Sequence, residues 1–227
     1  MSLLTLIRHG QSIWNQQNRF TGWVDVSLSQ SGVKEAQRAA QMLAQQRFAL
    51  AFTSELLRAQ DTLYEILRHN HQCHQYVRIH DTGSQWYEHF EMSPAEELEL
   101  KIYVSQQLNE RYYGDLQGLN KDKARQLFGD DQVHTWRRSY DVAPPNGESL
   151  AMTATRAIAY FQSHIVPALQ QGKNVLVCAH GNSLRAIIMH IEKMTASQIA
   201  AYELKTGSPH IYQCSTAMEI LSKQVLE

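Results

Sequence analysis

Two stretches of the sequence repeat one arrangement of residues that could carry chemistry, LLTLIRHGQS near the N-terminus and NVLVCAHGNS further along. In each, an apolar run ends at a His-Gly pair, His9-Gly10 or His180-Gly181, which an amide residue and a serine follow. Ligands bind beyond the carboxyl ends of the strands in parallel α/β sheets, so we expect both imidazoles at that edge. The two glycines would let the backbone turn sharply and approach a ligand closely.

The residues around these turns favour an anionic ligand. A helix expected to begin near Ser183 would offer free N–H groups and a positive dipole end. Arg8, Arg58 and the pair Arg137-Arg138 add guanidinium groups, the natural bidentate partners of phosphate. One histidine after a buried strand is more often a core or capping residue. Two identical turns beside an anion site indicate phosphoryl transfer to histidine.

The elements that would hold these turns follow from periodicity. Apolar runs predict strands over 3–8, 48–54 and 174–179, and two short strands in 210–221. Apolar residues at helical spacing predict helices over 31–46, with Ser29 as N-cap, and over 56–68, 149–169 and 183–193. Strands that alternate with helices are typical of a three-layer α/β/α fold with a mostly parallel, mixed central sheet.

Composition narrows the class of protein. The 227 residues carry 21 Lys+Arg against 22 Asp+Glu, a net charge of -1, which argues against partners found through a broad basic surface, such as nucleic acid or membranes. The apolar run at 3–7 is too short for a membrane span. Three cysteines without CxxC spacing favour a reducing, cytoplasmic setting. We expect one domain over 1–227.

The middle of the chain contains an acidic stretch, 79–101, with six Asp or Glu residues and a single Lys. We expect a surface insertion there, with a helix that begins at Ser93-Pro94.

A cluster of potential metal ligands precedes that stretch, His69, His71, Cys73 and His74. Their spacing matches no common zinc pattern. We therefore expect a solvated helix end whose histidines cap backbone carbonyls.

Six motifs, in this order along nearly the whole chain, carry a resemblance to a known family: RHGQSIWN (8–15), RFTGWVDVSLS (19–29), LNERYYGDLQGLNK (108–121), WRRSYDVAPP (136–145), GESL (147–150) and AHGNSLR (179–185). The sequence resembles the 2,3-bisphosphoglycerate-dependent phosphoglycerate mutases of the histidine phosphatase superfamily. The resemblance implies interconversion of 3-phosphoglycerate and 2-phosphoglycerate in glycolysis and gluconeogenesis. It also implies a phosphohistidine intermediate that 2,3-bisphosphoglycerate primes.

The same resemblance implies roles for individual residues. His9 would be the nucleophile, Glu110 the proton donor and acceptor, and His180 a stabiliser of the transferring group, with Arg8 and Arg58 beside them. Residues implied to bind substrate are Arg8, His9, Gly10, Gln11, Ser12, Ile13, Trp14, Asn15, Thr21, Gly22, Arg58, Glu110, Arg111, Tyr112, Tyr113, Lys121, Arg137, Arg138, Gly181 and Asn182. The family also implies a homodimer or a higher homo-oligomer.

No metal is expected. The phosphoryl transition state spreads its charge over several oxygens. Arg8, Arg58 and a protonated His180 could supply the positive charge that a metal ion provides in other phosphoryl transfer enzymes.

The chain departs from the family pattern outside these motifs. The 79–101 stretch is longer than usual, the link between Pro145 and Gly147 is shorter than in many members, and Lys205 stands where proline is common. Two alternatives remain open. One is a phosphatase of the same superfamily, in which water intercepts the phosphohistidine; the other is a catalytically silent binder of phosphorylated ligands.

Overall fold

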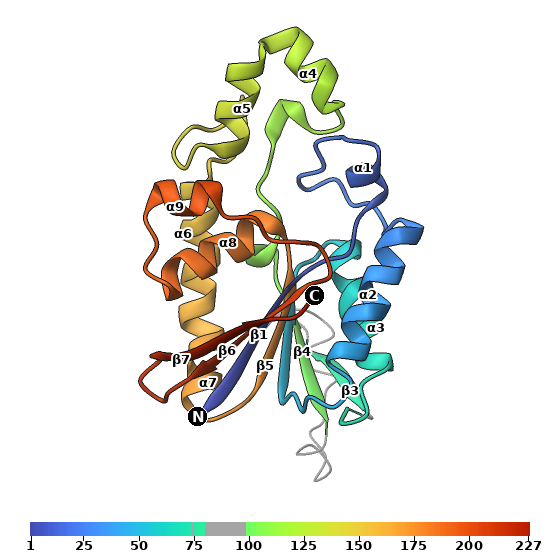
Figure 1. The fold of residues 1–227 in the computed structure, drawn as a ribbon, viewed down its shortest axis with the longest axis vertical. Helices are drawn as coiled ribbons and strands as arrows, with labels where there is room; N and C mark the ends of the chain where they lie inside the picture. The colour runs from blue at the N-terminus through green and yellow to red at the C-terminus, as the bar shows by residue number, and fades with distance from the viewer. Residues whose placement is uncertain (74, 80–98) are drawn as a thin grey trace.

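A mixed β-sheet runs through the centre of the structure, a computed structural model that describes residues 1–73, 75–79 and 99–227 (Figure 1). Within these residues the strand order is β3 (Tyr76–Ile79), β4 (Leu100–Val104), β2 (Leu50–Thr53), β5 (Val175–Ala179), β1 (Ser2–Arg8), β6 (Pro209–Cys214) and β7 (Ile220–Val225). The first five are parallel, whereas β6 pairs antiparallel with both β1 and β7. The predicted mostly parallel, mixed sheet is confirmed.

The central strand β5 shows why the sheet needs a cover on both faces, because all five of its residues are buried. Val175 and Val177 pack into one apolar cluster, and Leu176 and Cys178 pack into another on the opposite face. Continuous burial of this kind is typical of a parallel strand between two helical layers.

Two helical layers provide that cover (Figure 1). On one face lie α2 (Gln30–Met42) and α3 (Leu57–Arg68). On the other lie α6 (Leu150–Tyr160), the short π-helix η5 (Phe161–Ile165), α7 (Val166–Gln170) and α8 (Gly181–Ile191). The predicted N-cap of α2 is confirmed, since Ser29 Oγ accepts a hydrogen bond from Gly32 N at 3.0 Å.

Beyond the carboxyl ends of the parallel strands stands a helical hairpin, α4 (Lys121–Phe128) and α5 (Asp130–Arg138), at the top of Figure 1. It has a small core of its own around Phe20, Leu116 and Trp136. The short helices α1 (Ile13–Gln16) and α9 (Ala196–Ala201) lie near the same end, as do the 3₁₀ turns η3 (Gln106–Leu108) and η4 (Gly114–Leu116). The sequence analysis did not predict the hairpin or α9.

Several predicted boundaries differ from the structure. Helix α2 ends at Met42 and not at residue 46. Helix α8 begins at Gly181 and not at Ser183, so the helix starts directly after His180. At the ends of the acidic stretch, Ile79 belongs to β3, and Leu100 and Lys101 belong to β4, because these positions continue the sheet. The rest of that stretch, with the expected helix at Ser93-Pro94, lies outside the described residues.

Within the described ranges, no helix is long and apolar enough to cross a membrane.

Candidate active site

Neighbouring parallel strands bring the two histidines together, as the repeated motif predicts. Arg8 at the end of β1 pairs with Ala179 at the end of β5, and His9 N donates to Ala179 O at 3.0 Å. The imidazole rings of His9 and His180 consequently meet edge to face, with their centroids 4.9 Å apart.

The hydrogen bonds of His9 define which ring nitrogen can react. His9 Nδ1 lies 2.6 Å from Gly10 O, which can only accept, so Nδ1 carries the proton and Nε2 keeps its lone pair. Burial, followed by the charges of Arg58 and Arg8, lowers the pKa of His9 well below its usual value, and the bond to Gly10 opposes this only in part. His9 is therefore neutral at pH 7, and the unprotonated nitrogen of its ring is Nε2.

His180 is fully buried behind the site, and its Nε2 lies 2.6 Å from Ser54 Oγ. Burial, then the positive charge of Arg58, lowers the pKa of His180 well below its usual value. The protonated His180 that the sequence analysis expected is therefore not supported by these surroundings. Its Nδ1 is a buried atom with no hydrogen-bond partner among the described residues.

Arg58, in the first turn of α3, lies directly beside His9. Its Nε donates to His9 Nε2 at 3.3 Å, and its Nη1 and Nη2 donate to the carbonyls of Val24 and Gly22 at 3.1 and 2.8 Å. Burial lowers the pKa of Arg58 to about 10, so the guanidinium stays charged at neutral pH. Three bonds thus fix a positive charge beside the atom that would attack phosphorus.

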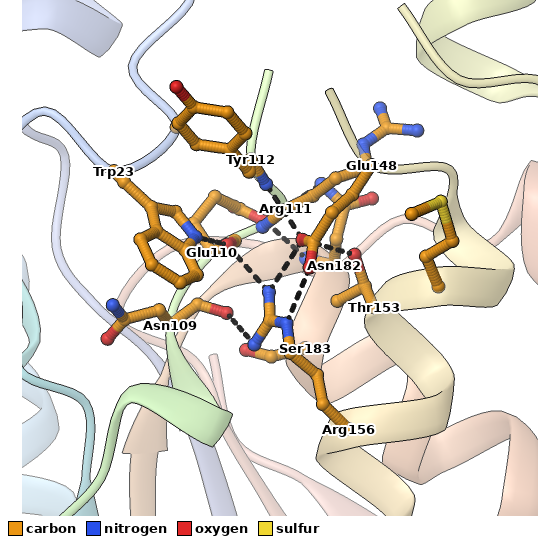
Figure 2. A network of polar contacts seen from close by, with 12 residues as sticks. Trp23, Asn109, Glu110, Arg111, Tyr112, Glu148, Thr153, Arg156, Asn182 and Ser183 are labelled. Carbon is orange, nitrogen blue, oxygen red and sulfur yellow. Dashed lines mark hydrogen bonds and ion pairs between the residues drawn. The ribbon is translucent and has the colours of Figure 1, made fainter. Parts of the chain in front are cut away.

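Glu110 approaches from the segment between η3 and η4 (Figure 2). Its Oε1 accepts hydrogen bonds from Asn182 N and Nδ2, at 3.1 and 2.9 Å, and from Arg111 N at 2.7 Å. In the described part of the chain, Oε2 accepts no hydrogen bond. The carboxylate is thus oriented through one oxygen, and the other is available for proton exchange.

A cavity of about 160 Å³ connects these groups with the hairpin. Its lining includes seven basic side chains and two acidic ones, Glu110 and Glu203. The basic residues are Arg8, Arg19, Arg58, Lys121, Arg137, Arg138 and Arg185. A chain with a net charge of -1 thus gathers seven of its 21 Lys and Arg residues in one cleft, as an anionic ligand requires.

Several buried donors around this cavity have no partner among the described residues: Arg8 Nε, Arg111 Nε and Nη1, and Thr21 Oγ1. Buried polar groups are rarely left without hydrogen bonds. Donors of this type fit the oxygens of a phosphate or carboxylate, so the residues present suit a phosphorylated acid.

Two features of the outer rim of the cavity affect its charge: an ion pair between Arg138 and Glu203, and a lysine with a lowered pKa. Arg138 Nη2 donates to Glu203 Oε1 at 2.6 Å, and both side chains are partly exposed. Burial, followed by the charges of Arg137 and Arg8, lowers the pKa of Lys121 to about 8.

Of the predicted site residues, the structure brings thirteen to the cavity lining: Arg8, His9, Asn15, Thr21, Gly22, Arg58, Glu110, Tyr113, Lys121, Arg137, Arg138, Gly181 and Asn182. The others lie outside the lining: Gly10, Gln11, Ser12, Ile13, Trp14, Arg111, Tyr112 and His180.

Some residues outside the lining support the loop that carries His9. Ser12 Oγ caps α1 by accepting a bond from Asn15 N at 3.1 Å, and Gln11 O accepts from Ser29 N at 2.8 Å. A Cβ on Gly10 would lie 2.3 Å from Gly32 O, so only glycine fits there. These contacts give Gly10, Gln11 and Ser12 a part in positioning the loop.

Sequence reasoning missed Ser54, Arg185 and Glu203. Arg185 lines the cavity from α8, where its Nη1 contacts Asn182 Oδ1 at 3.3 Å and its Nη2 donates to Ala200 O at 3.0 Å. Its place one helical turn after Asn182 was a readable signal. Ser54 directly follows the parallel strand β2, so its place at the same edge of the sheet was readable as well. Glu203 reaches the site only through tertiary folding.

The cluster of potential metal ligands after α3 behaves as a helix end. His69 Nδ1 lies 3.0 Å from Glu65 O, as expected of a capping histidine. In the portion of the chain that the structure describes, no group of three or more His, Cys, Asp or Glu side chains could hold a metal ion; His74 lies outside it.

Comparison with known families defines the class. The model of the histidine phosphatase superfamily (branch 1) matches residues 4–85 and 92–222. The fold is similar to that of YhfR from Bacillus stearothermophilus, with a TM-score of 0.75 and 24% identity over 97% of this chain and 94% of that one. It is also similar to the fold of a mycobacterial glucosyl-3-phosphoglycerate phosphatase, with a TM-score of 0.72 and 22% sequence identity over 100% of this chain and 98% of that one. The fold is that of a histidine phosphatase.

Curated relatives narrow the class further. The chain is 95% identical, over the full length of both, to the 2,3-bisphosphoglycerate-dependent phosphoglycerate mutase of Pseudoalteromonas atlantica. It is 46% identical to the phosphoglycerate mutase of Schizosaccharomyces pombe, over 100% of this chain and 96% of that protein. The chain therefore belongs to the 2,3-bisphosphoglycerate-dependent phosphoglycerate mutase family, which the sequence motifs predict.

Proposed function

We propose that the chain interconverts 3-phosphoglycerate and 2-phosphoglycerate, with His9 as the phosphoryl carrier and Glu110 as the proton carrier. Family membership supports the reaction. The observation that supports these roles best is the state of His9. Its Nδ1 is hydrogen-bonded to Gly10 O, and its Nε2 is unprotonated beside the Arg58 guanidinium.

His9 acts as nucleophile through Nε2. Its lone pair attacks phosphorus, and the bond between phosphorus and the ester oxygen of the bisphosphoglycerate breaks as the N–P bond forms. Arg58 and Arg8 offset the negative charge of the equatorial oxygens, an electrostatic effect of the kind that supplies most of the rate in phosphoryl transfer. Burial, together with the same two cations, keeps His9 neutral before the attack.

Glu110 balances the protons. In one half-reaction its carboxyl group donates a proton to the oxygen that leaves phosphorus. In the other, the carboxylate takes the proton of the attacking hydroxyl, while that oxygen receives the phosphoryl group from His9. A single carboxyl group can serve both directions because Asn182 holds one of its oxygens and leaves Oε2 available.

His180 stabilises the transferring group from the second turn. It is neutral in its present surroundings, but a phosphoryl dianion close by would raise its proton affinity. The unpaired Nδ1 of His180 would then be available to donate to a phosphoryl oxygen.

2,3-Bisphosphoglycerate is the cofactor in this proposal, and when bound it supplies the phosphoryl group that primes His9. The unpaired donors of Arg111 and Thr21, with Arg137 and Lys121 nearby, fit the remaining phosphate and carboxylate. No metal cofactor is required, because guanidinium groups supply the positive charge.

The proposed assembly and location follow from the family and composition. We propose that the whole chain, 1–227, acts as one domain, with a surface insertion within 79–101. We also propose a cytoplasmic homodimer or higher homo-oligomer that binds neither nucleic acid nor membranes.

Turnover of 3-phosphoglycerate, measured with and without trace 2,3-bisphosphoglycerate, tests the function. A mutase forms 2-phosphoglycerate and depends on the trace cofactor. Release of inorganic phosphate at a matching rate would instead indicate a phosphatase. Binding without any product would indicate a silent binder.

A further inference from the structure

The segment that carries Glu110 has no regular secondary structure. It runs from η3 to η4, and residues 109–113 lie in neither a helix nor a strand. Glu110 and Arg111 are nevertheless buried. Buried carbonyls need hydrogen-bond donors, and a segment of this kind must find them in side chains or in other parts of the backbone.

Arg156 of α6 supplies two of these donors and also binds the turn that precedes the segment (Figure 2). Its Nη1 donates to Gln107 O at 2.8 Å and to Asn109 O at 3.0 Å. Its Nη2 donates to Glu110 O at 2.9 Å, and Trp23 Nε1 donates to the same carbonyl at 2.5 Å. One guanidinium group therefore binds the backbone before and at Glu110.

Glu148, in the GESL motif, holds Arg156 in a bidentate ion pair. Arg156 Nε and Nη2 contact the two carboxylate oxygens, each at 2.9 Å. Glu148 also accepts from Tyr112 N at 2.9 Å and from Thr153 Oγ1 at 3.1 Å. The pair thus forms hydrogen bonds with the segment before Glu110, at Asn109, and after it, at Tyr112.

The electrostatics of the pair match this geometry. The side chains of Arg156 and Glu148 are only 13% and 17% exposed. Burial alone would raise the pKa of Glu148, but hydrogen bonds from Arg156 and Tyr112 outweigh it, so the pKa lies below its usual value. The Glu148 carboxylate is therefore charged at neutral pH.

The side chain and the backbone of Glu110 are bound by different residues. Asn182, at the start of α8, binds the carboxylate, whereas Arg156 and Trp23 bind the backbone carbonyl. Arg156 itself is not among the residues that line the cavity, and its hydrogen bonds near the site go to the segment that carries Glu110 and to Glu148.

We propose that Arg156 and Glu148 are positioning residues that hold Glu110 at the distance and angle needed for proton transfer. This inference rests on the proposed role of Glu110 as proton carrier. A displacement of about 1 Å in a reacting group can cost about a hundredfold in rate. Arg156→Lys keeps the charge but not the planar fork, and we expect kcat to fall about 10- to 100-fold.

The test is a double-mutant cycle on the full-length protein, with Arg156→Lys, Glu110→Gln and the double variant. For each we would measure kcat, the Kd of 3-phosphoglycerate and the melting temperature, with rates taken well below melting. If Arg156 acts through Glu110, Arg156→Lys lowers kcat in the wild-type background. It changes kcat less than about twofold in the Glu110→Gln background, because the group that it positions has already lost its function.

Asn70→Ala serves as the matched control. Asn70 is also a buried side chain that donates to two loop carbonyls, Leu43 O at 2.8 Å and Gln46 O at 2.9 Å, but it lies beyond the end of α3 that is remote from Arg58. Its substitution should lower the melting temperature and leave kcat unchanged. Glu148→Gln keeps the shape of the partner and should lower kcat less than Arg156→Lys.

An equal fold loss from Arg156→Lys in both backgrounds would overturn the proposal, because a purely structural defect multiplies any residual rate. Unchanged kcat in Arg156→Lys would overturn it as well. If Glu110→Gln alone retained full turnover, the proposed role of Glu110 would fail first, and the positioning role would fail with it. That outcome is distinct from a failure of positioning alone.

Discussion

His9 and Glu110 meet in one cavity, but the fold holds them in different ways. His9 follows a strand at the centre of the sheet, and two of its three hydrogen bonds are to backbone oxygens: its N–H donates to Ala179 O and its Nδ1 to Gly10 O, while Nε2 accepts from Arg58 Nε. Glu110 lies in an irregular segment, where side chains of Trp23 and Arg156 bind its carbonyl.

This difference bears on how each group responds to change. A backbone anchor is independent of side-chain identity, so substitutions far from the cavity should leave His9 in place. A substitution of Arg156 or Trp23, which bind the backbone of Glu110 from outside the cavity, would remove hydrogen bonds that hold Glu110 in place. We therefore expect the proton-transfer half of the site to be the more sensitive to mutation outside the cavity.

The largest effect among the substitutions is expected for Glu110→Gln, which keeps the shape of the side chain but cannot exchange a proton. General acid–base catalysis is worth about 10²–10⁴ in rate, so kcat should fall by that order. The Kd of 3-phosphoglycerate should change little. Steady-state kinetics with an independent binding measurement would check this. Retention of most of the turnover would mean that another group moves the proton.

The two regions also differ in how far the sequence predicts them. The turns at His9 and His180 are local patterns, a strand followed by His-Gly, so both their place and their proximity follow from parallel-sheet geometry. The role of Glu110 came from a family motif, because nothing in its local pattern marks it. Ser54, which contacts His180, also lies at the end of a predicted strand, so the same geometry places it. The contact of Glu203 with Arg138 depends on tertiary folding, which no local pattern encodes.

The helices show the same difference between features that a local pattern predicts and features that depend on tertiary contacts. The period of α2 and its Ser29 cap are readable, since apolar residues recur on one face. The α4–α5 hairpin is short and polar, and it is stabilised by its own small core around Phe20 and Trp136. That core joins residues more than a hundred positions apart, so periodicity alone does not reveal it.

A smaller effect, on binding, is expected for Arg137→Ala. Hydrogen bonds to charged groups contribute about 1.5–3 kcal/mol, which corresponds to a Kd for 3-phosphoglycerate about 10- to 100-fold weaker. The chemical step should lose less, because Arg137 lies on the hairpin and not beside His9. Isothermal titration together with kcat would separate the two effects. A loss confined to kcat would instead place Arg137 at the reacting atoms.

Lys121 should give binding a pH dependence. Its pKa is lowered to about 8, so the side chain loses its charge as pH rises through that value, and attraction of an anion weakens. The Kd of 3-phosphoglycerate should rise by up to about tenfold between pH 7 and pH 9. Lys121→Arg should flatten this profile, since arginine stays charged. An identical slope in both proteins would assign the titration to another group.

The smallest effect is expected for Glu203, whose carboxylate pairs with Arg138 at the rim of the cavity and would compete with the substrate for that guanidinium. Exposed ion pairs contribute about 0–1 kcal/mol, so Glu203→Gln should lower KM by no more than about fivefold, with kcat unchanged. Arg138→Gln in the same background should abolish that gain. An increase in KM for Glu203→Gln would show that Glu203 assists binding.

Covalent phosphorylation of His9 tests the central claim most directly. Intact-mass analysis at neutral or alkaline pH, after exposure to 2,3-bisphosphoglycerate, should show one added phosphoryl group on the wild type and none on His9→Ala. His71→Ala, which removes an exposed histidine away from the cavity, should retain the adduct. An adduct that persists in His9→Ala would contradict the assignment of His9 as the phosphoryl carrier.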